Sequence, residues 1–260
     1  MKKVISKDGT PIAYNRQGEG PPLVLVHGNG VVANNWMMVM PALAENFTVY
    51  AVDRRGRGES GDNDLYAIER EFEDIAAVVD SINQPVNLLG HSFGGILTLE
   101  GALLTKNVRK LILYEPTINL PDVQIVPGGL IEPMEKLINV GQKEEALLQF
   151  YESIGIPPSE IELMQTLPEW EARVAIAHTV LREISGVERR VLDVGKFTDV
   201  PFKTLFLIGE DGSEFWDEVL QVLNHTLPGF STDVLPGQGH LAMNTAPDLF
   251  VDAVTRFFKD

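Results

Sequence analysis

The chain has no cysteine among its 260 residues, and this absence excludes several kinds of protein. Without cysteine there is no disulfide framework, no thiolate metal site and no cysteine nucleophile. No stretch approaches the roughly 20 apolar residues of a membrane-spanning helix. The first residues turn polar too early for the apolar region of a signal peptide, so we expect a cytoplasmic protein.

Basic residues are scarce as well, with 21 lysines and arginines against 37 aspartates and glutamates and a formal net charge of −16. The resulting field repels nucleic acid and anionic membranes, so we expect neither as a partner. The length is ample for one large hydrophobic core. The expected partner is a small-molecule substrate, and the composition favours no oligomeric state.

Short apolar runs alternate with helical patterns. Nearly continuous apolar runs, typical of parallel strands covered on both faces, occur at 23–26, 47–52, 86–89, 108–114 and 204–208. Helical spacing occurs at 34–45, 68–83, 93–105, 214–226 and 246–258. This alternation predicts an α/β fold with a mostly parallel sheet, preceded by an antiparallel hairpin of 3–6 and 12–16 that turns at Asp8-Gly9.

The region 117–200 breaks this alternation, because it contains no run of the buried-strand kind. Its helical segments are predicted at 128–140, 143–153, 159–166 and 169–185. We interpret 117–200 as a helical cap over the carboxyl edge of the sheet, and 1–116 with 201–260 as the core.

Gly90-His91-Ser92-Phe93-Gly94 is the most informative motif, since it joins the strand 86–89 to the helix 93–105. A serine on such a sharp turn is held above the sheet edge, and the flanking glycines avoid collisions with neighbouring backbone. A serine hydroxyl becomes nucleophilic only when an oriented base removes its proton. His240 is the best candidate base, because it lies in a glycine-rich loop after the strand-like 232–235.

The other histidines carry different expectations. His27 orders the loop that precedes Asn29, His91 is the variable position of the serine motif, and His225 lies at a helix end, where its charge would suit the helix dipole. His178 falls in the predicted cap, where it would line a substrate pocket or pack. Trp36 would line the same pocket or pack a helix against the core.

An oxyanion hole needs two backbone N–H groups that face the developing negative charge. One should come from Phe93, the residue after the nucleophile. The other should come from Gly28-Asn29-Gly30, where glycines allow close approach of the backbone, and we favour Asn29.

Four motifs follow one another in chain order: His27-Gly28, the run 53–60, Gly90 to Gly94 and Gly239-His240. Through these motifs, the chain resembles the α/β-hydrolase superfamily over essentially its whole length. It looks like the small bacterial serine hydrolases related to cofactor-free haloperoxidases and haloalkane dehalogenases. The resemblance implies an eight-stranded sheet with a helical cap after the sixth strand, and we expect no metal or organic cofactor. Haloalkane dehalogenases and epoxide hydrolases carry aspartate at the position of Ser92, which disfavours those two activities.

The carboxylate that orients the base departs from the common pattern. Most relatives carry it after the seventh strand as Gly-x-x-Asp, whereas Gly209-Glu210-Asp211-Gly212 has glycine there and Asp211 one residue early. Some relatives carry a glutamate at the end of the sixth strand, as Glu115 does here. A carboxylate that closes an apolar strand is costly to bury unless it is paired. We expect Pro116 to hold Glu115 extended, and we favour Glu115 over Asp211, which stays the alternative.

Two further signals are given less weight. The run 56–61 matches the dinucleotide-binding pattern Gly-x-Gly-x-x-Gly, but no helix opens after it and it is not the first strand-to-helix turn, so a structural turn explains it better. Arg54, Arg55 and Arg57 are interpreted as a solvated turn paired with nearby acids rather than an anion site.

These observations predict a serine hydrolase of the carboxylesterase type, EC 3.1.1, acting on a small, fairly apolar ester, thioester or lactone. Perhydrolysis, with peroxide in place of water, would be a side reaction of the same site. The alternative is a ligand sensor of the same fold with slow or incidental hydrolysis.

Overall fold

The structure is a computed structural model that describes residues 1–125, 128–167, 169–188 and 190–259. It divides into two compact units. The sheet unit comprises Met1–Gly28, Val32–Ile118 and Asp193–Asp260, and the helical unit comprises Asn29–Val31 and Asn119–Leu192. The helical unit is therefore shorter at both ends than the expected 117–200, and it includes a tripeptide from the loop after the third strand.

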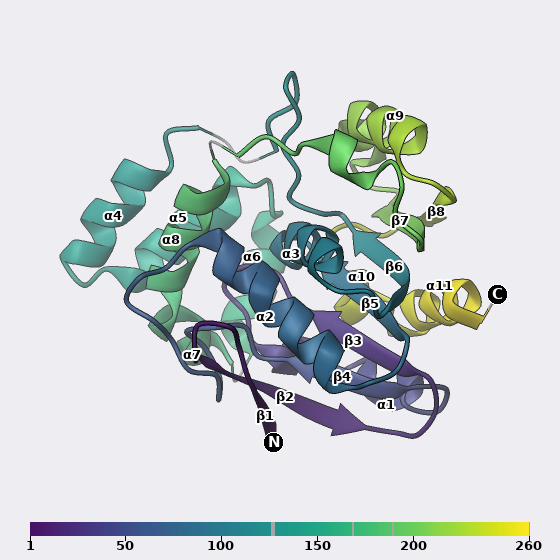
Figure 1. Ribbon diagram of the computed structural model, residues 1–260. Coiled ribbons are helices and arrows are strands. Elements are labelled where there is room, and N and C mark those ends of the chain that lie inside the picture. The colour runs from purple at the N-terminus through teal and green to yellow at the C-terminus, as the bar shows by residue number, and fades with distance from the viewer. Residues whose placement is uncertain (126–127, 168, 189, 260) are drawn as a thin grey trace. The chain divides into compact units, whose positions relative to one another are not determined.

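Eight strands form one sheet in the order β1-β2-β4-β3-β5-β6-β7-β8 (Figure 1). The strands are β1 (Lys2–Ile5), β2 (Pro11–Gln17), β3 (Pro22–Val26), β4 (Thr48–Val52), β5 (Val86–His91), β6 (Val108–Tyr114), β7 (Lys203–Gly209) and β8 (Phe230–Leu235). The β1–β2 and β2–β4 pairs are antiparallel and all other pairs are parallel. The predicted fold class and the N-terminal hairpin are confirmed.

The apolar runs explain the central strands. Every residue of β3 and β5 is buried, as expected for strands covered on both faces. β8 at the sheet edge is mostly exposed or half-buried. The sequence indicated only 232–235 of this strand, because its exposed positions interrupt the apolar run.

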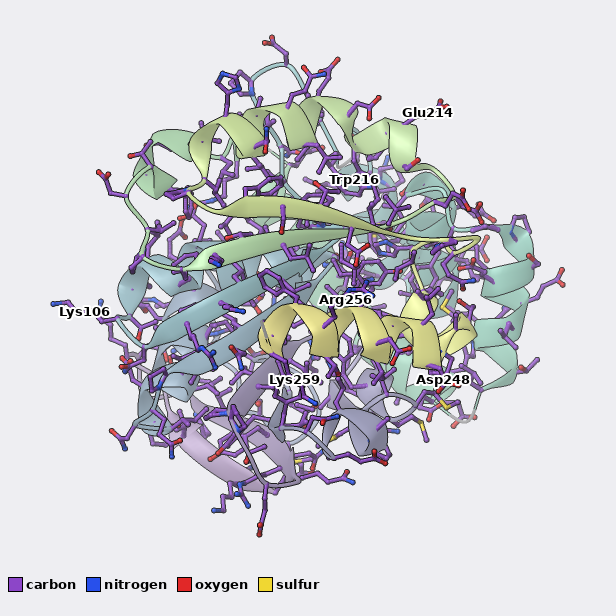
Figure 2. The ribbon with its side chains drawn as sticks, turned by 90° about the vertical axis from the view of Figure 1, so that its right-hand side faces the viewer. Lys106, Glu214, Trp216, Asp248, Arg256 and Lys259 are labelled. Carbon is purple, nitrogen blue, oxygen red and sulfur yellow. The ribbon has the colours of Figure 1, made fainter. Side chains whose placement is uncertain are left out.

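One face of the sheet carries the main hydrophobic core. Alternate strand residues such as Leu89 and Leu207 pack there against η1 (Ala33–Trp36), α1 (Met40–Leu43), α10 (Ala242–Thr245) and α11 (Pro247–Lys259). Figure 2 shows α11 in front of the sheet, with Asp248 near its start and Lys259 at its end. The prediction of a single helix at 34–45 is wrong. The 3₁₀ turn η1 and the separate short helix α1 lie there instead, and α1 has Pro41 in its first turn.

The opposite face is covered by α2 (Ile68–Ser81), α3 (Phe93–Gly101) and α9 (Asp217–Thr226), with the 3₁₀ turns η2 (Ala102–Leu104), η3 (Val194–Phe197) and η4 (Ser213–Trp216) in the same unit. Figure 1 shows α2 and α3 side by side, and a Cβ at Gly101 would lie 3.1 Å from Ile75 Cβ. Phe206 of β7 points to this face and its ring lies 5.5 Å from that of Trp216.

The helical unit contains α4 (Ile131–Asn139), α5 (Lys143–Ser153), α6 (Pro158–Thr166), α7 (Trp170–Ala175) and α8 (Ala177–Val187). The helix expected at 169–185 is two helices, because the chain leaves helical geometry at Ile176, with ψ of 9°. Within the described ranges, no helix is long and apolar enough to cross a membrane.

Candidate active site

Ser92 lies on a strained turn between β5 and α3. Its backbone has φ of 54° and ψ of −124°, a region that a residue with a side chain occupies only when its surroundings enforce it. The enforcing contacts are backbone hydrogen bonds: Ser92 N donates to Tyr114 O at 2.9 Å, and Ser92 O accepts from Gly95 N at 2.8 Å and Thr117 N at 3.0 Å. The turn is therefore tied to both α3 and the end of β6.

The flanking glycines make this turn possible. A Cβ at Gly90 would overlap Thr98 Oγ1, and one at Gly94 would overlap Val26 O. Gly28, in the loop after β3, is also constrained, since a Cβ there would lie 2.9 Å from Ser92 Cβ and 3.3 Å from Ser92 Oγ. The loop that was expected to carry an oxyanion donor therefore passes directly beside Ser92.

Glu115 and His240 are hydrogen-bonded. His240 Nδ1 lies 2.6 Å from Glu115 Oε2, and Glu115 Oε1 accepts from Gly209 N at 2.8 Å. The Glu115 side chain is 6% exposed and that of His240 24%, so the carboxylate is buried while the imidazole faces solvent in part. Because a carboxylate accepts, Nδ1 carries a proton, so in the neutral ring Nε2 is the nitrogen with the lone pair. This is the tautomer that a general base requires.

The backbone of Glu115 differs from our expectation. We expected Pro116 to hold it extended, but its φ is +42°, in the left-handed region. Thr117 N bonds to Ser92 O, in the turn after β5, and Glu115 N bonds to Leu207 O of β7 at 3.2 Å, so contacts with these two distant segments override the local preference. β6 does end before Glu115, as expected, but it ends at a left-handed turn rather than at an extended residue.

Asp211, the alternative acid, lies beside the His240 loop but is bonded to it differently. It is exposed, and its backbone N donates to Gln238 O at 2.9 Å. Within the part of the chain that the structure describes, the Asp211 carboxylate makes no hydrogen bond or ion pair with His240. Likewise, no hydrogen bond between described residues joins the Ser92 hydroxyl to the His240 ring, so that contact stays a prediction.

Two further residues anchor the His240 loop. The sequence did not single out Tyr114, and it gave His91 no role beyond the variable position of the serine motif. Tyr114 Oη donates to Gly239 O and accepts from Ala242 N at 3.1 Å, so it bridges the backbone on both sides of His240. His91 Nε2 lies 2.9 Å from His240 O, and the two rings are 4.5 Å apart. Tyr114 could have been noticed as a polar end to an apolar strand.

His91 is held neutral. Burial lowers the pKa of its imidazole well below the ordinary value, and neighbouring His240 lowers it further. Since a carbonyl oxygen only accepts, Nε2 carries the proton and donates to His240 O. Nδ1 is buried and has no hydrogen-bond partner among the residues that the structure describes. His91 therefore acts as a fixed donor rather than as a second titrating base.

His27 orders its loop as expected. Its Nδ1 lies 2.9 Å from Gly28 O, and its Nε2 accepts from Arg54 N at 3.4 Å. Burial lowers the pKa of His27 well below its ordinary value, and the charges of Arg54 and Arg57 lower it further. The ring is therefore neutral and donates from Nδ1.

The arginine turn is not solvated, which corrects our interpretation. Arg54, Arg55 and Arg57 are each at most 2% exposed. The expected acidic partners are present: Arg54 pairs with Glu71 and Arg55 with Asp74, each through two hydrogen bonds. Both acids lie on α2, far along the chain, so no local pattern could reveal the burial.

The two expected pocket residues differ in position. Trp36 is fully buried in the core, and its ring lies 6.3 Å from that of Phe250 and 6.2 Å from that of His91. This position agrees with the second expectation for Trp36, that it packs against the core. His178 is an exposed residue of α8. In the helical unit, Asn29 Nδ2 donates to Glu183 Oε2 at 2.6 Å. Pocket roles for Trp36 and His178 stay predictions, as do the oxyanion roles of Asn29 and Phe93.

Known proteins resemble the chain over nearly all of its length. A model of the alpha/beta hydrolase family matches residues 23–253. An alpha/beta hydrolase from Sphaerobacter thermophilus DSM 20745 is 33% identical, with a TM-score of 0.86 over 99% of this chain and 100% of that chain.

Two more distant structures share the fold. An esterase from Exiguobacterium antarcticum is 21% identical, with a TM-score of 0.79 over 100% of this chain and 99% of that chain. A bromoperoxidase from Bacillus anthracis is 19% identical, with a TM-score of 0.80 over 100% of both chains. With the motifs, the sheet order and the family match taken together, this chain belongs to the alpha/beta hydrolase family.

Proposed function

We propose that the protein is a serine hydrolase that cleaves a small, fairly apolar carboxylic ester, thioester or lactone through an acyl-enzyme. Family membership supports a hydrolase. The observation that carries the finer proposal is the 2.6 Å hydrogen bond between His240 Nδ1 and the buried carboxylate of Glu115. It leaves the basic nitrogen of His240 available at the sheet edge where Ser92 lies.

In the first half of the reaction, His240 Nε2 takes the proton of the Ser92 hydroxyl as Oγ attacks the substrate carbonyl. Glu115 holds the imidazole in the required tautomer and stabilises the imidazolium that forms. The N–H groups of Phe93 and Asn29 bind the oxyanion, and each such donor contributes about 10²–10³ in rate. The tetrahedral intermediate collapses when His240 gives its proton to the leaving alcohol or thiol.

In the second half, His240 removes a proton from water, which attacks the acyl-enzyme. Collapse of the second intermediate returns the proton to Ser92 Oγ and releases the carboxylic acid. The acidic surface favours an uncharged substrate over an anionic one, because a net charge of −16 repels anions from the protein. It also favours departure of the anionic product.

The test is hydrolysis of p-nitrophenyl acetate and p-nitrophenyl butyrate by the wild type, Ser92→Ala and the control Ser231→Ala, which alters an exposed serine of β8. We expect rapid turnover by the wild type and the control, and a loss of about 10⁴-fold or more in Ser92→Ala. Hydrolysis by Ser92→Ala at the rate of the wild type would refute the assignment of Ser92 as the nucleophile. Stoichiometric acylation without turnover would favour the ligand-sensor alternative.

A further inference from the structure

Arg54 lies beside two groups of the proposed oxyanion hole. Its guanidinium Nη1 donates to Gly28 O at 2.8 Å, and its Cζ lies 4.6 Å from the centroid of the Phe93 ring. The residue is 2% exposed, and Glu71 binds its Nε and Nη2 at 2.8 and 2.9 Å. A single buried cation thus contacts the loop after β3 and the first residue of α3.

The contact with Gly28 sets the direction of a peptide group. Gly28 O accepts from both Arg54 Nη1 and His27 Nδ1, so this carbonyl is held by two donors. In a planar trans peptide the C=O and the following N–H point in opposite directions. Fixing the carbonyl of Gly28 therefore aims the N–H of the next residue, Asn29, away from Arg54.

The contact with Phe93 fixes the second donor. Phe93 is 1% exposed, and a guanidinium over an aromatic face is an attractive arrangement that strengthens when water is excluded. Because the Phe93 N–H lies in the first turn of α3, a ring held in place restrains the start of that helix. Arginine suits both tasks, since its planar group stacks and donates in fixed directions, as a lysine ammonium does not.

A stability role alone explains this arrangement poorly. A buried ion pair loses the hydration of both ions, and its attraction often does no more than offset that loss. Arg55 shows what a buried pair looks like elsewhere on the same turn: its guanidinium binds Asp74 at 2.7 Å and Asp8 at 2.9 Å. Arg54 differs by reaching Gly28 and Phe93.

We infer that Arg54 is a positioning residue that aligns the N–H groups of Asn29 and Phe93. This inference rests on the proposed function. It predicts that Arg54 acts on the transition state rather than on substrate binding, so its loss lowers kcat and leaves KM nearly unchanged.

The test compares Arg54→Lys with the matched control Arg55→Lys, which alters a similarly buried arginine of the same turn that also binds a carboxylate of α2 through two hydrogen bonds. We expect kcat for p-nitrophenyl butyrate to fall 10- to 100-fold in Arg54→Lys and less than threefold in Arg55→Lys, with KM within twofold in both. Binding of a boronic acid, which becomes tetrahedral on Ser92, should weaken in parallel with kcat in Arg54→Lys. If Arg54→Lys does not fold, the charge-free pair Arg54→Met with Glu71→Met takes its place, with the same expected losses.

Equal losses of kcat in the two lysine variants, or unchanged boronic-acid binding in Arg54→Lys, would overturn the inference and leave the proposed function intact. A wild type that neither hydrolyses the esters nor binds the boronic acid would overturn both. Circular dichroism and thermal unfolding of each variant separate loss of fold from loss of alignment.

Discussion

The ends of β6 and β7 are neighbours in the sheet, and each is followed closely by a carboxylate, yet the two carboxylates differ in burial and in their bonding to His240. Glu115, after β6, is buried and binds His240. Asp211, after β7, is exposed and bonds to the His240 loop through its backbone N. The end of β7 instead supplies Gly209 N, which donates to Glu115 Oε1.

Under the proposed function, this difference makes the end of β6, and not the end of β7, the source of the acid that orients His240. Parallel strands end at one edge of the sheet, so a carboxylate at either end lies near the same loop. The backbone decides between them here. The left-handed turn at Glu115 accompanies its bond to His240, while Gly212 occupies the position where most relatives carry the acid.

The largest effect is expected from removing the charge at the end of β6. Glu115→Gln should lower kcat by about 10³–10⁴-fold, because the amide cannot hold the required tautomer or stabilise the imidazolium. Asp211→Asn, the matched change at the end of β7, should stay within twofold of the wild type. Ester hydrolysis by both variants measures the contrast, and the reverse ranking would make Asp211 the acid.

The comparison can be sharpened by moving the acid from one strand end to the other. Gly212 has a φ of +81°, and a Cβ there would have no atom within 4 Å. Aspartate tolerates this conformation better than most residues do. We expect that adding Gly212→Asp to the Glu115→Gln variant raises its kcat about 10-fold. Gly212→Asn in the same background is the control. Equal activity of the two double variants would argue against an interchangeable acid.

Much of this contrast could be read from the sequence, and the reason differs between its parts. The sequence predicts that Ser92, His240 and Glu115 lie together because each comes after an apolar run, and parallel strands bring such positions to one edge; the bond between Glu115 and His240 agrees with this prediction. The left-handed turn at Glu115 was not foreseen, since its causes are bonds to residues 92 and 207 rather than to sequence neighbours.

The same limit explains the misjudged arginines and the missed loop anchors. Arg54 and Arg55 are buried by acids of α2, and Tyr114 and His91 bind backbone atoms of a loop more than 100 residues away. Periodicity reports which faces are apolar, but it carries no information on such pairs. The broken helix at 34–45 had a local signal, Pro41, that helical spacing concealed.

A smaller effect is expected from the second link between β6 and the His240 loop. Tyr114→Phe removes the hydroxyl that bridges Gly239 O and Ala242 N, and an unpaired buried group costs about 1–3 kcal/mol. We expect kcat to fall about 10-fold with KM unchanged, together with a lower melting temperature. An unaltered kcat would mean that Glu115 and His91 hold the loop without Tyr114.

The smallest expected effect is a change in how stability depends on pH, caused by His91 at the end of β5. His91 has a lowered pKa in the folded protein, so below pH of about 6.5 the unfolded chain takes up a proton that the folded chain does not. Stability therefore falls on acidification, by up to about 1.4 kcal/mol per pH unit. Between pH 7.5 and 5.5, His91→Gln should lose about 1 kcal/mol less than the wild type in urea unfolding. Equal losses in both proteins would show that His91 titrates normally.

The claim that Glu115 orients the base is tested most directly by proton NMR of the His240 imidazole. A short Nδ1–H bond to a carboxylate should give a strongly downfield resonance, assigned by its loss in His240→Gln. We predict that this resonance persists in Asp211→Asn and disappears in Glu115→Gln. Its persistence in Glu115→Gln, or its loss in Asp211→Asn alone, would contradict the account.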